Sequence, residues 1–196
     1  DLKRRGLVVE PAVTGERPHA RHNRPHADRK PKEYRVEALR DLVEIDTMHL
    51  TPLPGLERRQ FTAVDVHSRY SVVGVRSCGM AGIARDFLAR TPFSVWVLQV
   101  DGARAVMAEF QAACREWGLP LFALPPRSPQ LNGHVERGNR TYRTEFWEVY
   151  DGDLELPPLQ QASREWGAEY IHVRPHQALG YLTPAAYLAS LGEHHV

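Results

Sequence analysis

Three carboxylates in this chain have surroundings and spacing that suit phosphate chemistry. Asp46 lies within the apolar run 42–48, and Asp101 directly follows the apolar run 95–100. Both runs predict buried strands. Glu136 follows a proline-rich segment and stands in the first turn of an expected polar helix. Two carboxylates on strands and one on a helix are the set of groups that a two-metal phosphoryl-transfer site requires.

Each of these acidic residues also has an ordinary structural interpretation. A single Asp in a strand, such as Asp46, is usually an edge or turn residue, and Asp101 followed by glycine is typical of a strand-ending turn. A carboxylate such as Glu136 suits the positive end of a helix dipole. Asp65 competes with Asp46, because it too lies on an expected strand. What distinguishes the three candidates is their joint spacing, with 34 residues, 102–135, between Asp101 and Glu136.

The elements that would position these groups follow from hydrophobic periodicity. Apolar and alternating runs predict strands over 42–50, 61–66, 70–75, 95–100 and 119–124, and the proline-containing segment 51–60 is predicted to be irregular. Helices are predicted over 82–90, 105–117, 135–150 and 159–172. Three consecutive strands, followed by alternating helices and strands, predict a mixed α/β fold.

Several of these segments resemble the catalytic core of the DDE integrases and transposases, in the bacterial insertion-sequence branch that is related to retroviral integrases. The matching segments follow in the family's order over roughly residues 40–190, at 43–47, 61–70, 100–101, 125–137 and 174–184. The resemblance implies an α/β ribonuclease H-like fold, with a mixed five-stranded sheet flanked by helices.

The same resemblance implies the chemistry of the site. Asp46, Asp101 and Glu136 correspond to the family's catalytic carboxylates, which hold two Mg²⁺ or Mn²⁺ ions. The attacking group would be water for strand cleavage and a DNA 3′-hydroxyl for strand transfer, so the expected enzyme is a DDE polynucleotidyl transferase. The family also keeps an aspartate at the position of Asp65, where it is structural and binds no metal.

Basic residues beyond Glu136 suggest contacts with DNA. Arg140 and Arg143 match family positions that touch the terminal DNA of the mobile element, and Asn139 shares their helix face. With the neighbouring Arg137 they form the predicted DNA-binding group, for which a solvated charged face is the alternative. The expected partners are the ends of a mobile element, target DNA and further copies of this chain assembled on DNA.

The sequence departs from the family directly after Asp101. The family commonly has Asn-Gly, a small residue, an acid and an aromatic, whereas this chain has Gly-Ala-Arg-Ala-Val over 102–106. Because the second carboxylate loses this support, reduced activity is expected. Two alternatives therefore stand beside the transposase interpretation: a ribonuclease H-like nuclease that only hydrolyses, and an inactive DNA-binding remnant.

Charge is distributed unevenly along the 196 residues. The net charge is only +1, but residues 1–36 carry ten Lys or Arg and five Asp or Glu. We therefore expect a basic linker or arm over 1–40. The resemblance implies that this arm follows a missing N-terminal helix-turn-helix region and that 41–196 form the catalytic core with a helical tail. Two cysteines without metal-ligand spacing favour a reducing, intracellular setting, and no apolar run reaches membrane-spanning length. The resemblance implies a cytoplasmic, nucleoid-associated bacterial protein without a membrane partner.

Overall fold

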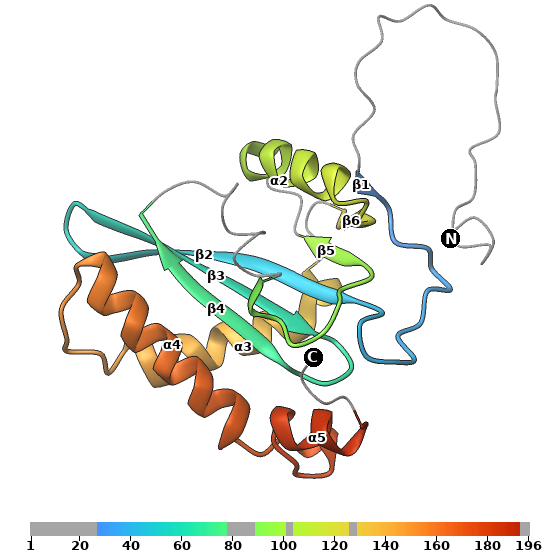
Figure 1. The fold of residues 1–196 in the computed structure, drawn as a ribbon. Helices are drawn as coiled ribbons and strands as arrows, with labels where there is room; N and C mark the ends of the chain where they lie inside the picture. The colour runs from blue at the N-terminus through green and yellow to red at the C-terminus, as the bar shows by residue number, and fades with distance from the viewer. Residues whose placement is uncertain (1–26, 78–88, 101–103, 126–128, 193–196) are drawn as a thin grey trace, which may run out of the picture.

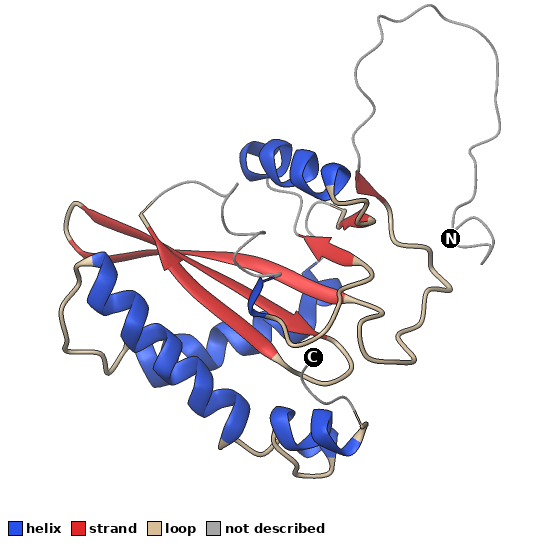
Figure 2. Ribbon diagram, in the orientation of Figure 1, coloured by secondary structure: helices blue, strands red, loops and turns tan. Residues whose placement is uncertain are grey.

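A computed structural model describes residues 27–77, 89–100, 104–125 and 129–192. Within these ranges six strands form one sheet in the order β1-β6-β5-β2-β3-β4, with helices on both of its faces (Figures 1 and 2). The strands are β1 (Ala27–Asp28), β2 (Val43–Leu53), β3 (Leu56–Asp65), β4 (Ser71–Arg76), β5 (Leu98–Val100) and β6 (Leu121–Ala123). The longer helices are α2 (Arg104–Glu116), α3 (Gly133–Tyr142), α4 (Leu156–His172) and α5 (Pro184–Ser190).

The sheet has the mixed pairing that the resemblance implies. β3 is antiparallel to both β2 and β4, whereas β5 runs parallel to β2 and to β6. The predicted ribonuclease H-like arrangement is therefore confirmed, and the five expected strands are present. The sixth strand, β1, is a two-residue addition at the edge, parallel to β6.

The prediction that segment 51–60 is irregular is wrong, because β2 and β3 continue through it as a long hairpin. Backbone pairing extends to Leu53 and Leu56, and the turn contains Gly55 with φ +80°. The register shifts between Leu50 and Leu53, around Pro52. Proline is tolerated at such an irregularity, since its missing N–H does not interrupt a regular ladder there.

The helices differ from the prediction mainly at their ends. The helix predicted over 82–90 falls largely outside the described residues. The helix predicted over 135–150 is an α-helix only as far as Tyr142, after which η2 (Arg143–Trp147) forms a π-helical turn. The backbone N–H of Glu148 donates to the carbonyl of Arg143, which is the five-residue spacing of such a turn.

Side chains on the central strands alternate between the two faces of the sheet. Val43, Ile45, Phe61, Ala63, Leu98 and Val100 belong to one buried cluster, which also contains Phe110 and Cys114 of α2 and Leu188 of α5. The residues between them include Glu44, Thr62 and Gln99, all buried and polar. The central part of the second face is therefore polar, and α3 lies against it (Figure 1).

Apolar packing on this second face occurs further along the sheet. Val73 and Val75 of β4 form a cluster with Tyr142, Phe146 and Leu159, which come from α3, η2 and α4. The Tyr142 hydroxyl lies 2.6 Å from Ser163 Oγ, which ties the end of α3 to α4. This cluster holds the far end of α3 and leaves its first turns over the polar part of the sheet.

Part of the predicted arm belongs to the packed structure. β1 pairs with β6, and the Tyr34 ring meets Phe122 of β6 edge-on, with centroids 5.2 Å apart. The folded region accordingly begins before residue 41, whereas residues 1–26, including the expected end of a helix-turn-helix unit, lie outside the described residues. Within the described part of the chain, no helix is both long and apolar enough to cross a membrane.

Candidate nucleic-acid and metal site

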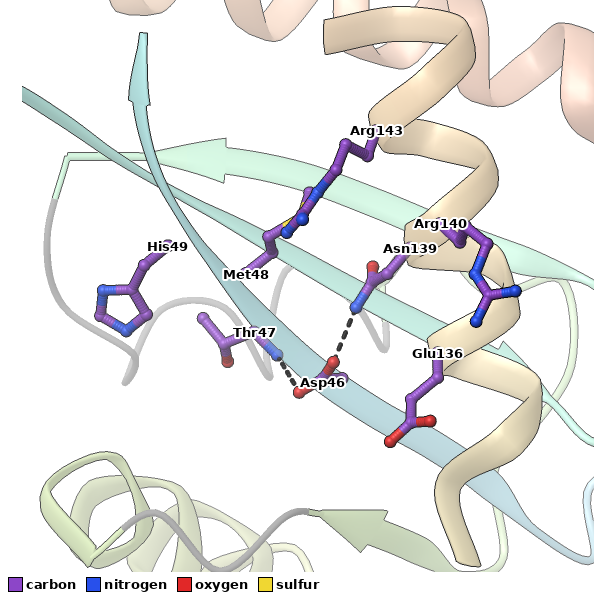
Figure 3. Close-up of a pocket in the computed structure, with 8 residues that line it drawn as sticks. All are labelled: Asp46, Thr47, Met48, His49, Glu136, Asn139, Arg140 and Arg143. Atoms are coloured by element: carbon purple, nitrogen blue, oxygen red, sulfur yellow. Dashed lines mark hydrogen bonds between the residues drawn. The ribbon is translucent and has the colours of Figure 1, made fainter. Parts of the chain in front are cut away.

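A cleft of about 420 Å³ lies between β2 and α3. Its lining residues are Asp46, Thr47, Met48, His49, Glu136, Asn139, Arg140 and Arg143. Figure 3 shows the two carboxylates on opposite walls, with Glu136 extending from α3 toward the side of β2 that carries Asp46. The cleft therefore brings together two of the three predicted catalytic residues and three of the four predicted DNA-binding residues.

Asp46 is held in a defined orientation by two hydrogen bonds. Its Oδ1 accepts from the backbone N–H of Thr47 at 2.8 Å, and its Oδ2 accepts from Asn139 Nδ2 at 2.7 Å. Asn139 was predicted to contact DNA, but its amide is directed at the carboxylate in this structure (Figure 3). The asparagine therefore links α3 to the predicted metal ligand on β2.

Asp101 lies outside the described residues, but the strand that precedes it is described. β5 ends at Val100 and runs parallel to β2, with Val100 paired to Ile45. Ile45 and Val100 are the residues directly before Asp46 and Asp101. The two strands that were expected to carry the aspartates are therefore neighbours in the sheet.

Glu136 is placed by a contact that the sequence did not reveal. The segment before it, 125–133, ends in asparagine and glycine, which permit many backbone conformations. The Glu44 carboxylate instead accepts from the backbone N–H groups of His134 and Val135, at 2.9 and 3.1 Å, and also pairs with His134 Nδ1. Asn132, the local N-cap residue, makes no side-chain cap bond. Glu44 thus caps α3 from β2 and fixes the turn that carries Glu136.

A second contact supports the same end of α3. Gln99 of β5 donates from Nε2 to the Leu131 carbonyl at 2.7 Å, just before the helix begins. Glu44 and Gln99 were not predicted as site residues. Their signal in the sequence is a polar residue alternating with apolar ones in a buried strand, as in Val43-Glu44-Ile45 and Leu98-Gln99-Val100.

The predicted DNA-binding residues fall on two sides of α3. Arg140 and Arg143 are exposed and line the cleft, and Arg143 Nη2 lies 3.2 Å from the Met48 sulfur. Arg137 does not line it. Burial, together with the charge of Arg137, lowers the pKa of the Arg69 guanidinium in the turn between β3 and β4. The structure therefore separates Arg137 from the other three residues.

Asp65 occupies a structural position, as the resemblance implied. Its carboxylate accepts from the backbone N–H and the hydroxyl of Ser68, each at 2.7 Å, and from the Arg40 N–H at 3.2 Å. Burial raises the pKa of Asp65, and the hydrogen bonds from Ser68 act against this shift. These contacts hold the turn between β3 and β4 and lie outside the cleft.

Replacing Asp65 by alanine should destabilise the protein without altering the cleft. The change leaves buried donors of Ser68 and Arg40 without an acceptor, so we expect a loss of at least about 2 kcal/mol in the free energy of unfolding. Urea denaturation would measure this loss. Below the transition, divalent-metal affinity should equal that of the wild type, and a marked loss of affinity in the folded variant would place Asp65 in the functional site.

The donor groups in the cleft fit a hard divalent cation. Asp46 and Glu136 offer carboxylate oxygens, which are the ligands that Mg²⁺ and Mn²⁺ prefer. Among the described residues, no group of three or more His, Cys, Asp or Glu is clustered closely enough to hold a metal. Asp101, the third predicted ligand, lies outside the described residues.

Comparisons with known proteins agree with this geometry. Residues 118–184, about a third of the chain, match the family model described as integrase core domain. No curated protein matches. Among solved structures, the chain is similar to one from the cryoEM structure of a simian T-cell lymphotropic virus intasome in complex with PP2A regulatory subunit B56 gamma. The TM-score is 0.59 at 19% identity.

That match covers 82% of this chain but only 56% of the viral chain, so this chain spans little more than half of its relative's length. At this identity the structural likeness establishes the ribonuclease H-like fold alone, and the family match is independent evidence of similarity to an integrase core domain over 118–184. The chain therefore has the ribonuclease H-like fold, and its residues 118–184 are similar to an integrase core domain.

Proposed function

We propose that this chain cleaves DNA strands at the ends of a mobile element and joins them to target DNA. The observation that carries this proposal is the cleft, in which Asp46, Glu136 and two arginines meet beside the strand that leads to Asp101. Acidic groups suit a metal-dependent reaction centre, and the arginines suit a polyanionic substrate.

In this proposal Asp46, Asp101 and Glu136 hold two Mg²⁺ or Mn²⁺ ions. Bound ions of this kind activate an attacking oxygen and offset the negative charge that develops at phosphorus. The protein supplies the geometry: Asp46 is oriented by Asn139 and the Thr47 N–H, and Glu136 by the capped first turn of α3. Water would attack in strand cleavage, and a DNA 3′-hydroxyl would attack in strand transfer.

DNA would approach across Arg140 and Arg143. Both side chains are exposed, lie on the cleft wall and follow Glu136 by one and two helical turns, so a phosphate backbone in the cleft would pass them. We further propose that the chain acts as an oligomer assembled on DNA, within the bacterial nucleoid, because two mobile-element ends must be brought to one target.

Charge reversal at Arg140 or Arg143 should weaken DNA binding. Arg140→Glu and Arg143→Glu each remove a cation that would release counterions from DNA, so the slope of log affinity against log salt should fall by about one per residue. Fluorescence anisotropy at several salt concentrations would measure affinity and slope. Arg164→Glu, at an exposed site on α4, is the matched control. Wild-type affinity and slope in both cleft variants would mean that the arginines are merely solvated.

A strand-transfer assay tests the proposed reaction and separates it from its alternatives. The substrate is a duplex with the terminal inverted repeats that flank the gene, incubated with the protein, target DNA and Mg²⁺ or Mn²⁺. Cleaved and joined products support the proposal. Cleavage without joining would indicate a nuclease that only hydrolyses. DNA binding without either product would indicate an inactive remnant, for which the unusual segment 102–106 gives a sequence-based reason.

A further inference from the structure

A buried chain of hydrogen bonds runs from η2 to Asp46. Trp147 Nε1 donates to Gln60 Oε1 at 2.6 Å, and Gln60 Nε2 lies 3.3 Å from Asn139 Oδ1. Asn139 Nδ2 then donates to Asp46 Oδ2 at 2.7 Å. Gln60 is fully buried and Asn139 is 7% exposed, so water competes little for either amide. The path joins a residue at the far end of the helical segment to the carboxylate in the cleft.

The Trp147 donor sets the direction of each hydrogen bond in this series. An indole N–H can only donate, so Gln60 must turn its oxygen toward Trp147. The Gln60 amide nitrogen then faces Thr62 Oγ1, at 2.8 Å, and the oxygen of Asn139. Asn139 must in turn direct its NH₂ group at Asp46. The Asp46 carboxylate only accepts and favours the same direction from the other end, so the indole donor and the carboxylate together select one orientation of the two amides.

The π-helical turn explains how Trp147 reaches Gln60. A π turn is wider than an α turn, so each residue in it rotates less about the helix axis. Arg143 stands one α turn beyond Asn139, and Trp147 follows Arg143 through the π turn. The smaller rotation keeps Trp147 on the helix side that faces β3, where Gln60 lies. π turns within α-helices frequently occur at functional sites.

We propose that Trp147 and Gln60 are positioning residues, which lock the Asn139 amide so that it donates to Asp46. A donated hydrogen bond holds the carboxylate in one rotamer, whereas a reversed amide would place an oxygen against that carboxylate. The inference rests on the proposed function only in taking Asp46 as a metal ligand. The orientation of Asn139 is a property of the protein without metal.

Trp147→Phe is the most direct test, because it removes the indole N–H and keeps an aromatic ring beside Phe146, whose centroid lies 5.3 Å from that of Trp147. Trp166→Phe is the matched control. It makes the same chemical change in the same apolar cluster, next to Tyr142, and Trp166 has no hydrogen bond to Gln60 among the described contacts. Gln60→Glu is a second, nearly isosteric variant, whose oxygens only accept and should draw the Asn139 NH₂ group away from Asp46.

Two measurements would be made on each ¹⁵N-labelled protein. The first is the side-chain NH₂ resonance of Asn139 without metal, assigned by its absence in Asn139→Ala. The second is the Mn²⁺ dissociation constant from paramagnetic relaxation. We expect Trp147→Phe to shift the Asn139 resonance and to raise the Mn²⁺ dissociation constant about threefold. Gln60→Glu should raise the same constant about tenfold, near the lower end of the losses that follow when a residue supporting a metal ligand is changed. Trp166→Phe should change neither quantity.

The outcomes separate this inference from the proposed function. An unmoved Asn139 resonance in Trp147→Phe would overturn the inference, and so would wild-type Mn²⁺ affinity in Gln60→Glu. If the wild type itself binds no Mn²⁺, or if Asp46→Asn does not weaken binding, the proposed metal site fails. The Asn139 resonance then still decides whether Trp147 and Gln60 orient the amide.

Discussion

Replacing Asp46 by asparagine is expected to reduce DNA strand cleavage and joining by about 1,000-fold or more, because metal ligands act as a unit and the loss of one disables the site. The substitution keeps the shape of the side chain and removes its charge. An asparagine oxygen can still accept from Asn139 Nδ2, as Asp46 does at 2.7 Å, so the contact between β2 and α3 should survive. The midpoint of thermal unfolding should therefore change little. Product formation on mobile-element ends would be measured at saturating Mn²⁺.

Asp151→Asn is the matched control for this experiment. Asp151 is exposed in the segment between η2 and α4, so the same change there should leave cleavage unaltered. The Mn²⁺ affinity of both variants would be measured in parallel and should fall only for Asp46→Asn. Cleavage within tenfold of wild type in a folded Asp46→Asn protein would remove Asp46 from the catalytic group.

The sheet could be predicted because its information is local. Alternating or continuous apolar residues give each of β2 to β6 its own signal, and Asp46 interrupts such a run, where a carboxylate requires an explanation. The grouping of Glu136, Asn139, Arg140 and Arg143 was also accessible, since helical spacing alone puts them on one side of α3. The cleft now gathers all four.

The support of the cleft could not be predicted, because it depends on contacts distant in sequence. Glu44 and His134 are 90 residues apart, and nothing near either residue indicates their pairing. The end of α3 was missed for a different reason: a π turn differs from an α turn by a single residue in hydrogen-bond spacing and has no clear composition. The long hairpin was missed because two prolines and a glycine lie in its tip, although backbone pairing continues up to Leu53 and Leu56 on either side of the turn.

These missed contacts share one physical feature, the polar part of the sheet beneath α3. Glu44 caps the start of the helix, Gln99 holds the residues before it, and Gln60 orients Asn139 further along. An apolar surface would hold a helix equally well, but it would not fix the direction of a donor at Asp46. Burying polar groups is costly unless they are paired, so each of these side chains is tied to a definite partner on the helical side.

On this polar surface, we expect the largest loss of stability from substitution of Glu44. Glu44→Leu should lower the free energy of unfolding by about 3 kcal/mol or more, because the N–H groups of His134 and Val135 lose their acceptor in a buried position. It should also impair catalysis well below the unfolding transition, since Glu136 lies in the same helical turn. Glu44→Gln keeps an acceptor and loses the charge that favours a helix N-terminus, so we expect a cost of about 1 kcal/mol.

Hydrogen exchange can distinguish this local effect from general unfolding. In the wild type the backbone amides of His134 and Val135 should exchange slowly, whereas in Glu44→Leu they should exchange faster than those of β3, because the first turn of α3 opens on its own. Glu57→Leu is the matched control, being the same change at an exposed position on β3. If the two amides stay protected in Glu44→Leu while the whole protein loses stability, Glu44 supports the core in general. Cleavage by the folded fraction should then remain close to wild type. If protection and cleavage fall together, the carboxylate on β2 is what holds Glu136 at the cleft.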